Sequence, residues 1–141
     1  MSSYVVRQRV FGDLGSDVYA LDAALSPAAA TVAVPLSSGT AKLYDASGLS
    51  YVGELTGHTA TLNAFTWAGE REEAAASASS DGTAKLWDVR TRQAVATLQP
   101  PAAALEACSV DVSGNLIAVG TSKGQVSLYD ARTHQRLQLY E

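Results

Sequence analysis

The chain has 141 residues, a formal net charge of −4, 47% apolar residues and only 17% charged residues. This composition provides enough apolar material for a core, and its acidic balance disfavours nonspecific binding to nucleic acid or to an anionic membrane surface. The single cysteine, Cys108, excludes an internal disulfide framework and a four-cysteine zinc site.

The N-terminal segment does not resemble a signal peptide, because Arg7, Arg9 and Asp13 interrupt it before any apolar run forms. The longest uncharged stretch, residues 23–41, contains two prolines and is rich in alanine and serine, which is too weakly hydrophobic for a membrane span. We therefore expect a soluble, cytoplasmic protein without membrane contacts, with the nucleus or a cytoskeletal or ciliary assembly as alternatives.

One short segment recurs three times along the chain. SSDGTAKLWD (residues 79–88) has near-copies at residues 37–45 and 121–130, and each copy ends in an aromatic residue followed by aspartate. The three aromatic residues are 43 and 42 residues apart, and each lies five residues after a glycine. A period of about 40–45 residues that ends in Trp-Asp is typical of a four-stranded propeller blade.

Short β-like runs fill each period in the same order. The first repeat has runs at residues 18–26, 31–37, 40–46 and 49–55; the second at 61–68, 74–80, 83–90 and 94–99; the third at 107–113, 116–122, 125–132 and 135–141. These runs are too short and too interrupted by turn residues for ordinary helices.

The second repeat contains a turn signal at Asp81-Gly82 and an alanine-rich segment at residues 74–80. Asp81-Gly82 between two β-like runs predicts a hairpin with a type I′ turn, in which both central residues have positive φ. The alanine-rich residues 74–80 have the propensity of a helix, but the repeat places them on a strand, where small residues fit between two packed sheets. We follow the repeat and expect a strand.

With these residues in view, the chain resembles the WD-repeat β-propeller family from about Val18 to Glu141. The resemblance rests on Gly57-His58, Asp81-Gly82 and Trp87-Asp88. It implies an all-β propeller of three four-stranded blades.

The expected blades span residues 17–56, 57–99 and 102–141, and residues 3–12 would form the outer strand of a closing blade. Because propellers need four to eight blades, we expect an incomplete ring, the N-terminal part of a seven-bladed propeller. The alternative is a half-propeller that completes itself as a homo-oligomer.

In this family a histidine, a serine or threonine, an aspartate and the tryptophan form a buried hydrogen-bonded network. The resemblance transfers these roles to His58, Ser79, Asp81 and Trp87, with Ser77 as an alternative serine on the same face of the strand. An imidazole donates to a carboxylate and accepts from a hydroxyl, and a buried indole N–H needs a partner. A catalytic His-Asp-Ser triad would require an exposed nucleophile, and we disfavour it.

The outer repeats depart from this pattern. Ser38 and Lys123 stand where the aspartate is expected, and Tyr44 and Tyr129 replace the tryptophan. Residues 99–101, QPP, replace the Gly-His segment of the third repeat. We expect those blades to be held by sheet pairing and apolar stacking alone.

The other chemically distinctive side chains have simpler interpretations. Cys108 lies in an inner-strand pattern, where a buried inert thiol is the usual outcome. His134 is expected to be solvated in a turn, and Phe65 and Trp67 are expected in the core. The sequence contains no phosphate loop and no metal-spaced ligand set, so we expect no cofactor or metal.

The resemblance favours a noncatalytic protein–protein interaction scaffold within a multisubunit complex. The family's contact rim carries over to Thr59, Ser80 and Ser122, with Pro100 and Pro101 shaping the neighbouring loop. The alternatives are a propeller that binds a small molecule or nucleic acid, or an enzyme with no recognisable site. The acidic charge and the absence of convergent titratable groups disfavour them.

Overall fold

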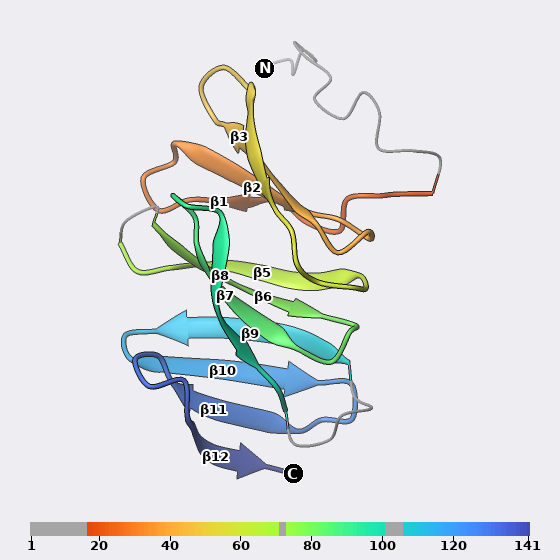
Figure 1. The fold of residues 1–141 in the computed structure, drawn as a ribbon, viewed down its shortest axis with the longest axis vertical. Coiled ribbons are helices and arrows are strands. Elements are labelled where there is room, and N and C mark those ends of the chain that lie inside the picture. The colour runs from red at the N-terminus through yellow and green to blue at the C-terminus, as the bar shows by residue number, and fades with distance from the viewer. Residues whose placement is uncertain (1–16, 71–72, 101–105) are drawn as a thin grey trace, which may run out of the picture.

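The computed structural model describes residues 17–70, 73–100 and 106–141, which form three antiparallel four-stranded sheets stacked along the long axis (Figure 1). The first sheet, blade 1, contains β1 (Ala24–Leu25), β2 (Thr31–Pro35), β3 (Ala41–Asp45) and β4 (Tyr51–Leu55). Blade 2 contains β5 (Leu62–Ala68), β6 (Ala74–Ser79), β7 (Ala84–Asp88) and β8 (Gln93–Leu98). Blade 3 contains β9 (Ala107–Ser113), β10 (Leu116–Thr121), β11 (Val126–Asp130) and β12 (Arg136–Tyr140).

Each blade is a simple meander in which sequential strands are hydrogen-bonded neighbours. This arrangement confirms the expected all-β architecture of an incomplete propeller. Within the described ranges, no helix has the length and apolar character needed to cross a membrane. The expected strand at residues 3–12 lies outside the described residues.

The alanine-rich segment forms the strand β6 and not a helix. Ala75 belongs to the apolar core shared with blade 1, whereas Ala78 belongs to the core shared with blade 3. Both faces of the strand are therefore covered, and residues 75–79 are all buried. Small side chains allow the neighbouring blades to approach this strand from both sides, which explains why packing overrides helix propensity.

The first inner strand is shorter than the sequence predicts. Only β1 forms within the expected range of residues 18–26, together with an isolated bridge between Ala20 and Leu36. Pro35 lies opposite the gap and has no N–H to donate, although its carbonyl accepts from the N–H of Leu21 at 3.0 Å. The pairing also slips by one residue between Ala20–Leu36 and Ala24–Ala33, so the ladder is interrupted.

The predicted type I′ turn at Asp81-Gly82 is wrong. Gly82 has φ of 90°, but Asp81 is not among the residues with positive φ. The Ser79 N–H donates to Thr83 O at 3.0 Å, which closes a three-residue loop with its last residue in the left-handed region. Gly39 and Gly124 occupy the same position in blades 1 and 3, with φ of 88° and 84°.

Two apolar cores hold the blades together. The first joins Leu43 and Leu55 of blade 1 to Phe65 and Trp87 of blade 2. The second joins Leu98 and other blade 2 residues to Ala107, Ile117, Val119 and Tyr129 of blade 3. Each core lies between two sheets, so blade 2 is packed on both faces.

Candidate functional site: the loop network and rim of the central blade

A chain of hydrogen bonds crosses one end of blade 2. His58 comes from the loop between β4 and β5, and its Nδ1 lies 2.8 Å from Oδ2 of Asp81 in the β6–β7 turn. Its Nε2 lies 2.7 Å from Oγ of Ser77 on β6. The indole Nε1 of Trp87 on β7 donates to the same Ser77 oxygen at 2.8 Å.

The partners define the direction of these hydrogen bonds. Burial lowers the pKa of His58, although the hydrogen bond and charge of Asp81 act in the opposite direction. The neutral ring is satisfied when Nδ1–H donates to the carboxylate and Nε2 accepts from the Ser77 hydroxyl. Ser77 then accepts from the indole, so every member of the network has a partner.

Asp81 is the anchor of this network. Burial raises the pKa of its carboxyl, but hydrogen bonds from the Thr83 hydroxyl and N–H, from His58 and from the Thr59 N–H outweigh burial and lower the pKa to about 2. The shortest of these, from Thr83 Oγ1 to Oδ1, is 2.7 Å. Thr83 was not singled out from the sequence, although a threonine two residues after an aspartate is a recognisable turn signal.

The structure places Ser77, and not Ser79, between the imidazole and the indole. Ser79 instead donates from Oγ to Ala60 O and accepts from the Asp81 N–H, both at 3.1 Å. Both serines share a face of β6, so strand parity could not separate them. The Ser-x-Asp spacing, typical of a serine side chain bonded to the backbone two residues later, was the available signal.

The geometry of this network suits a structural role. The side chain of Ser77 is fully buried, and its oxygen is shared between two rings. The network ties the loop that enters β5 to the turn that leaves β6. Among the described residues, no cluster of three or more His, Cys, Asp or Glu side chains could hold a metal ion.

The aspartate of each repeated aromatic-Asp pair lies at the end of its blade opposite the His58–Asp81 network, where it accepts backbone hydrogen bonds. Asp45 Oδ2 accepts from the Gly48 N–H at 2.7 Å, and Asp130 Oδ1 accepts from the Arg132 N–H at 2.8 Å. In blade 2, Asp88 Oδ1 accepts from two backbone N–H groups of the following turn. Each aspartate therefore fixes the turn into the outermost strand of its own blade.

Blade 3 shows what happens without the network. Lys123 occupies the position of Asp81, and the neighbouring side chains Thr121 and Gln125 occupy those of Ser79 and Thr83. Thr121 Oγ1 and Gln125 Oε1 are buried, and neither has a hydrogen-bond partner among the residues that the structure describes. This agrees with the expectation that the third repeat cannot build the network.

The three rim residues expected from the sequence lie at the same end of the blades as the network. Thr59 and Ser122 are exposed, and Ser80 is half-buried. The Ser80 N–H donates to Thr61 O at 2.9 Å, and the Ser122 N–H donates to Glu106 O at 3.0 Å, so each turn is tied to the loop entering its blade.

Asn63 links this rim across two blades. Its Nδ2 donates to Ser80 Oγ at 3.0 Å and to Ala107 O of blade 3 at 2.9 Å. It lies at the register shift between β5 and β6, where a β-bulge turns the side chain out of the regular alternation. No sequence motif points to this role of Asn63. Pro100, beside the rim, is buried, and Pro101 lies outside the described residues.

The expectation for Cys108 is wrong, because its side chain is exposed. The pairing of β9 with β10 shifts between Gly120 and Thr121, so Cys108 is the extra residue of a β-bulge. The bulge leaves Ala107 and Val110 on the inward face and turns Cys108 outward. A reading based on simple alternation could not detect this.

The expectations for the aromatic residues and for His134 are confirmed. Phe65 is buried, and Trp67 packs half-buried against the same core, where its Nε1 donates to Ala24 O at 3.0 Å. The two rings meet edge to face with centroids 5.6 Å apart. His134 is exposed in the β11–β12 turn.

Comparisons with known proteins agree with this architecture. The family model described as "WD domain, G-beta repeat" matches residues 49–88. The WD repeat-containing protein 89 homolog of Dictyostelium discoideum is 30% identical over 91% of this chain and 34% of its own length. The WD repeat-containing protein GTS1 of Arabidopsis thaliana is 34% identical over 78% of this chain and 29% of its own length.

A solved structure shares the fold. A chain in the crystal structure of the mitotic checkpoint complex superposes with a TM-score of 0.79 at 22% identity, covering 89% of this chain and 38% of that one. The present chain therefore spans about a third of the length of the curated relatives it matches. The repeated aromatic-Asp pairs, the three four-stranded blades and these relatives together show that the chain belongs to the WD-repeat family.

Proposed function

We propose that the chain is a noncatalytic scaffold that presents the rim of Thr59, Ser80 and Ser122 to protein partners, as a cytoplasmic subunit of a larger assembly. WD-repeat proteins are generally interaction scaffolds within complexes. The proposal assigns to this chain the same general role, at the rim of blades 2 and 3.

The main support for this proposal is that the polar side chains of blade 2 are hydrogen-bonded to one another. His58, Asp81 and Ser77 are committed to one another and to Trp87, and they hold two rim segments together. A rim fixed in this way loses little conformational freedom on binding, which favours recognition by a protein surface. The exposed rim groups are small, so the large anchoring side chains of a contact would come from the partner.

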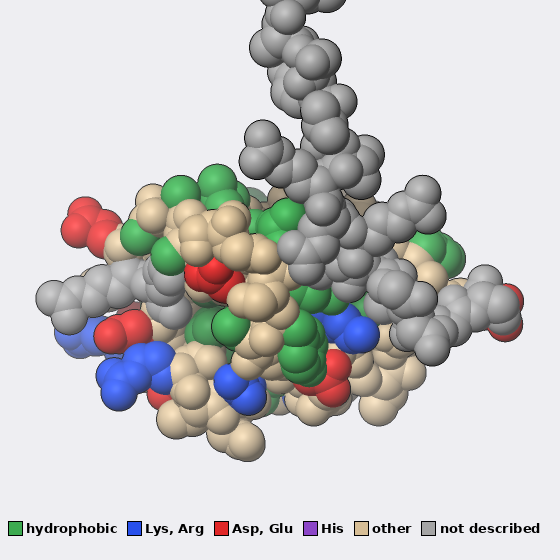
Figure 2. Space-filling model, turned by 90° about the horizontal axis from the view of Figure 1, so that it is seen from above, with side chains coloured by type: hydrophobic (Ala, Val, Ile, Leu, Met, Phe, Trp, Pro, Cys, Tyr) green, Lys and Arg blue, Asp and Glu red, His purple; other side chains and the backbone are tan. Residues whose placement is uncertain are grey.

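The surface charge supports a protein partner over nucleic acid. The net charge is −4. At the blade 1 end of the stack, the visible Lys and Arg side chains are interspersed with Asp and Glu (Figure 2). Nucleic-acid binding would favour a continuous basic surface.

The test is a quantitative capture of partners from cell extract by the tagged chain, with mass spectrometry as the readout. Thr59→Arg and Ser122→Arg should each reduce recovery of a reproducible partner set by at least about tenfold. Gln93→Arg, an exposed position at the start of β8 on the outer circumference, is the matched control and should leave recovery unchanged. Loss of partners only in the control would place the contact on the circumference and overturn the proposal.

A further inference from the structure

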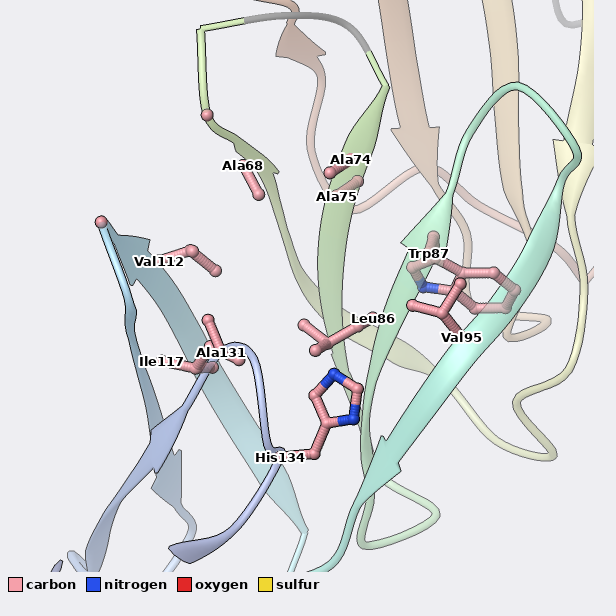
Figure 3. A pocket seen from close by; sticks show the side chains of 12 residues that line it. Ala68, Ala74, Ala75, Leu86, Trp87, Val95, Val112, Ile117, Ala131 and His134 are labelled. Carbon is pink, nitrogen blue, oxygen red and sulfur yellow. The ribbon is translucent and has the colours of Figure 1, made fainter. Parts of the chain in front are cut away.

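An apolar cavity of about 300 Å³ lies between blades 2 and 3 (Figure 3). It is bordered by the ends of β5 and β9 and by the β11–β12 turn, which are opposite the end that carries Ser80 and Ser122. Its walls are formed by alanine, glycine, valine, leucine, isoleucine and tryptophan, and His134 is the one lining residue with an uncommitted polar side chain.

The interface between blades 1 and 2 provides an internal comparison. Trp67 of blade 2 pairs with Ala75, and Val112 of blade 3 pairs with Ile117 at the same position of its sheet. Arg92 and His134 also correspond, with φ of 59° and 60° in equivalent turns.

Large side chains cross the first interface. Trp67 Nε1 donates to Ala24 O of blade 1 at 3.0 Å, and Arg92 Nη2 donates to Val52 O at 2.6 Å. The guanidinium lies directly over Gly53, where a Cβ atom would be 2.5 Å from Arg92 Cζ. An indole and a guanidinium from blade 2 therefore bridge the two blades on this side.

Among the described residues, the interface between blades 2 and 3 has neither of these bridges. Val112 replaces the indole, and Ala131 replaces Val89 at the start of the turn; the N–H groups of Ala131 and Val89 make equivalent hydrogen bonds. The imidazole of His134 is shorter than the guanidinium, and it makes no hydrogen bond to any described residue. The cavity occupies the space that these smaller side chains leave.

We propose that this cavity receives an aromatic side chain of the indole type from a protein partner. Its volume is at the lower end of ligand cavities and suits a single ring system. The walls provide apolar contact for the ring, and the His134 imidazole provides one acceptor for the indole N–H. Val95 lines the cavity and is 57% exposed, so the opening continues onto an apolar surface.

The interface between blades 1 and 2 indicates which side chain would occupy the cavity. The equivalent interface is completed by an indole whose N–H is hydrogen-bonded, in a wall with the same Leu and Val positions, Leu43 and Val52 in place of Leu86 and Val95. Tryptophan is also enriched among residues that dominate binding energy at protein interfaces. The inference rests on the proposed protein-binding function only in that the ring belongs to a protein partner.

The test titrates the isotope-labelled 141-residue chain with N-acetyl-tryptophanamide and follows its NMR spectrum. We expect saturable shifts at Val95, Val112 and Ile117, with an affinity in the millimolar range that is at least about threefold tighter than that of N-acetyl-leucinamide. Because the probe is a small molecule, the result does not depend on any partner or on the rim.

Two variants refill the cavity. Val112→Trp and Ala131→Val introduce the side-chain types found at Trp67 and Val89, and each should weaken probe binding by at least about fivefold. Ala118→Val is the matched control, since Ala118 pairs with Leu128 on the opposite face of blade 3, and it should retain the parent affinity within about twofold. Ala131→Val alone decides the outcome if the larger tryptophan prevents folding.

Saturable shifts at the cavity that are lost in Ala131→Val and kept in Ala118→Val would support the proposal. Absence of saturable shifts, shifts confined to other residues, or equal binding by the parent and Ala131→Val would overturn it. Such a failure would leave the rim experiment unaffected, so the two proposals can fail separately.

Discussion

At the scale of single residues, the Ser77 hydroxyl is the centre of blade 2. It accepts from the Trp87 indole and donates to the His58 imidazole, so it joins a strand, its neighbour and the loop entering the blade. A buried polar group in such a network stabilises the fold only while every partner is present. Removing one member therefore leaves another buried polar group without a hydrogen-bond partner, which lowers the free energy of unfolding.

We predict that His58→Ala and Asp81→Ala each lower the free energy of unfolding by about 1–3 kcal/mol, because each leaves a buried polar partner unsatisfied. Chemical denaturation measures the change. The matched control is Thr59→Ala, whose contact with Asp81 is through the backbone N–H and is kept. Unfolding curves of His58→Ala and Asp81→Ala that overlay the parent would show that the network is not structural.

We also predict that stability falls as the pH falls from neutrality. Burial depresses the pKa of His58 below 6.5, and hydrogen bonds depress that of Asp81 to about 2 from 3.8. For both groups the unfolded chain binds more protons than the folded chain in acid, so the slope of stability with pH is positive. The His58 contribution is complete above pH 6.5. The Asp81 contribution is complete above about pH 4 and is lost as the pH approaches 2.

Melting temperatures measured in steps from pH 7.5 down to pH 3 check this prediction. Asp81→Asn should flatten the dependence of melting temperature on pH below about pH 4, because the amide that replaces the carboxyl group does not titrate. Thr59→Ala, which keeps the backbone N–H contact with Asp81, should leave the profile unchanged. Equal slopes below pH 4 in Asp81→Asn and the parent would contradict the assignment.

The sequence predicted most of this site but not its final connections. The resemblance to the WD-repeat family identified three members, His58, Asp81 and Trp87, because each matches a fixed position of the family's repeat. The choice between Ser77 and Ser79 depends on the reach of the indole across the sheet, which strand parity does not encode. The prediction that Cys108 is buried was wrong because of a β-bulge, in which one inserted residue reverses the alternation of inward and outward side chains.

At the scale of elements, the three turns that follow the second strands share one backbone conformation but have different surroundings. Gly39 and Gly124 have φ of 88° and 84°. A Cβ atom on Gly39 would lie 2.5 Å from the carbonyl oxygen of Ala60, which belongs to the loop entering blade 2. Apart from Gly124 and its two chain neighbours, no atom of the described residues lies within 4 Å of the same position on Gly124.

This difference predicts that Gly39→Ala is more damaging than Gly124→Ala. Both substitutions place a side chain in a left-handed conformation, at a cost of about 1 kcal/mol. Gly39→Ala must also displace the backbone of the adjacent blade, which adds about 1–3 kcal/mol. The comparison of their unfolding free energies isolates this inter-blade contact, and equal losses would refute its importance.

The strand pattern itself was largely predictable. The runs at residues 40–46, 83–90 and 125–132 form β3, β7 and β11, which each begin one residue inside the run and end one or two residues before its end. β9 spans residues 107–113 as expected. The repeat period supplies this accuracy, because it aligns weak local signals from three copies. It cannot report local exceptions such as Pro35, which shortens β1, or the three-residue loop at Gly82.

At the scale of the whole molecule, the described blades form an open stack. One face of blade 3 packs on blade 2, and the described residues leave its other face uncovered. Leu116, Val126 and Tyr140 on that face are 47%, 37% and 54% exposed. Val126 pairs directly with Tyr140, whereas Leu116 pairs with Asp130 at the other end of the same sheet. Apolar sheet faces of this kind are usually covered by another blade or another chain.

We therefore predict that the 141-residue chain by itself does not remain a free monomer. Association through the outer face of blade 3 should raise its mean mass as concentration increases. Leu116→Lys should reduce this association, because it places a charge in the apolar face. Gln93→Lys, at the exposed position on the outer circumference at the start of β8, is the control and should leave association unchanged.

Sedimentation velocity of the purified chain across the micromolar range, with circular dichroism to establish folding, tests most directly the claim that this is an open stack of propeller blades that requires further protein contacts. The account predicts a β-rich protein whose weight-average sedimentation coefficient rises with concentration and falls back towards the monomer value in Leu116→Lys. A well-folded, monodisperse monomer at every concentration, with no partner present, would contradict it.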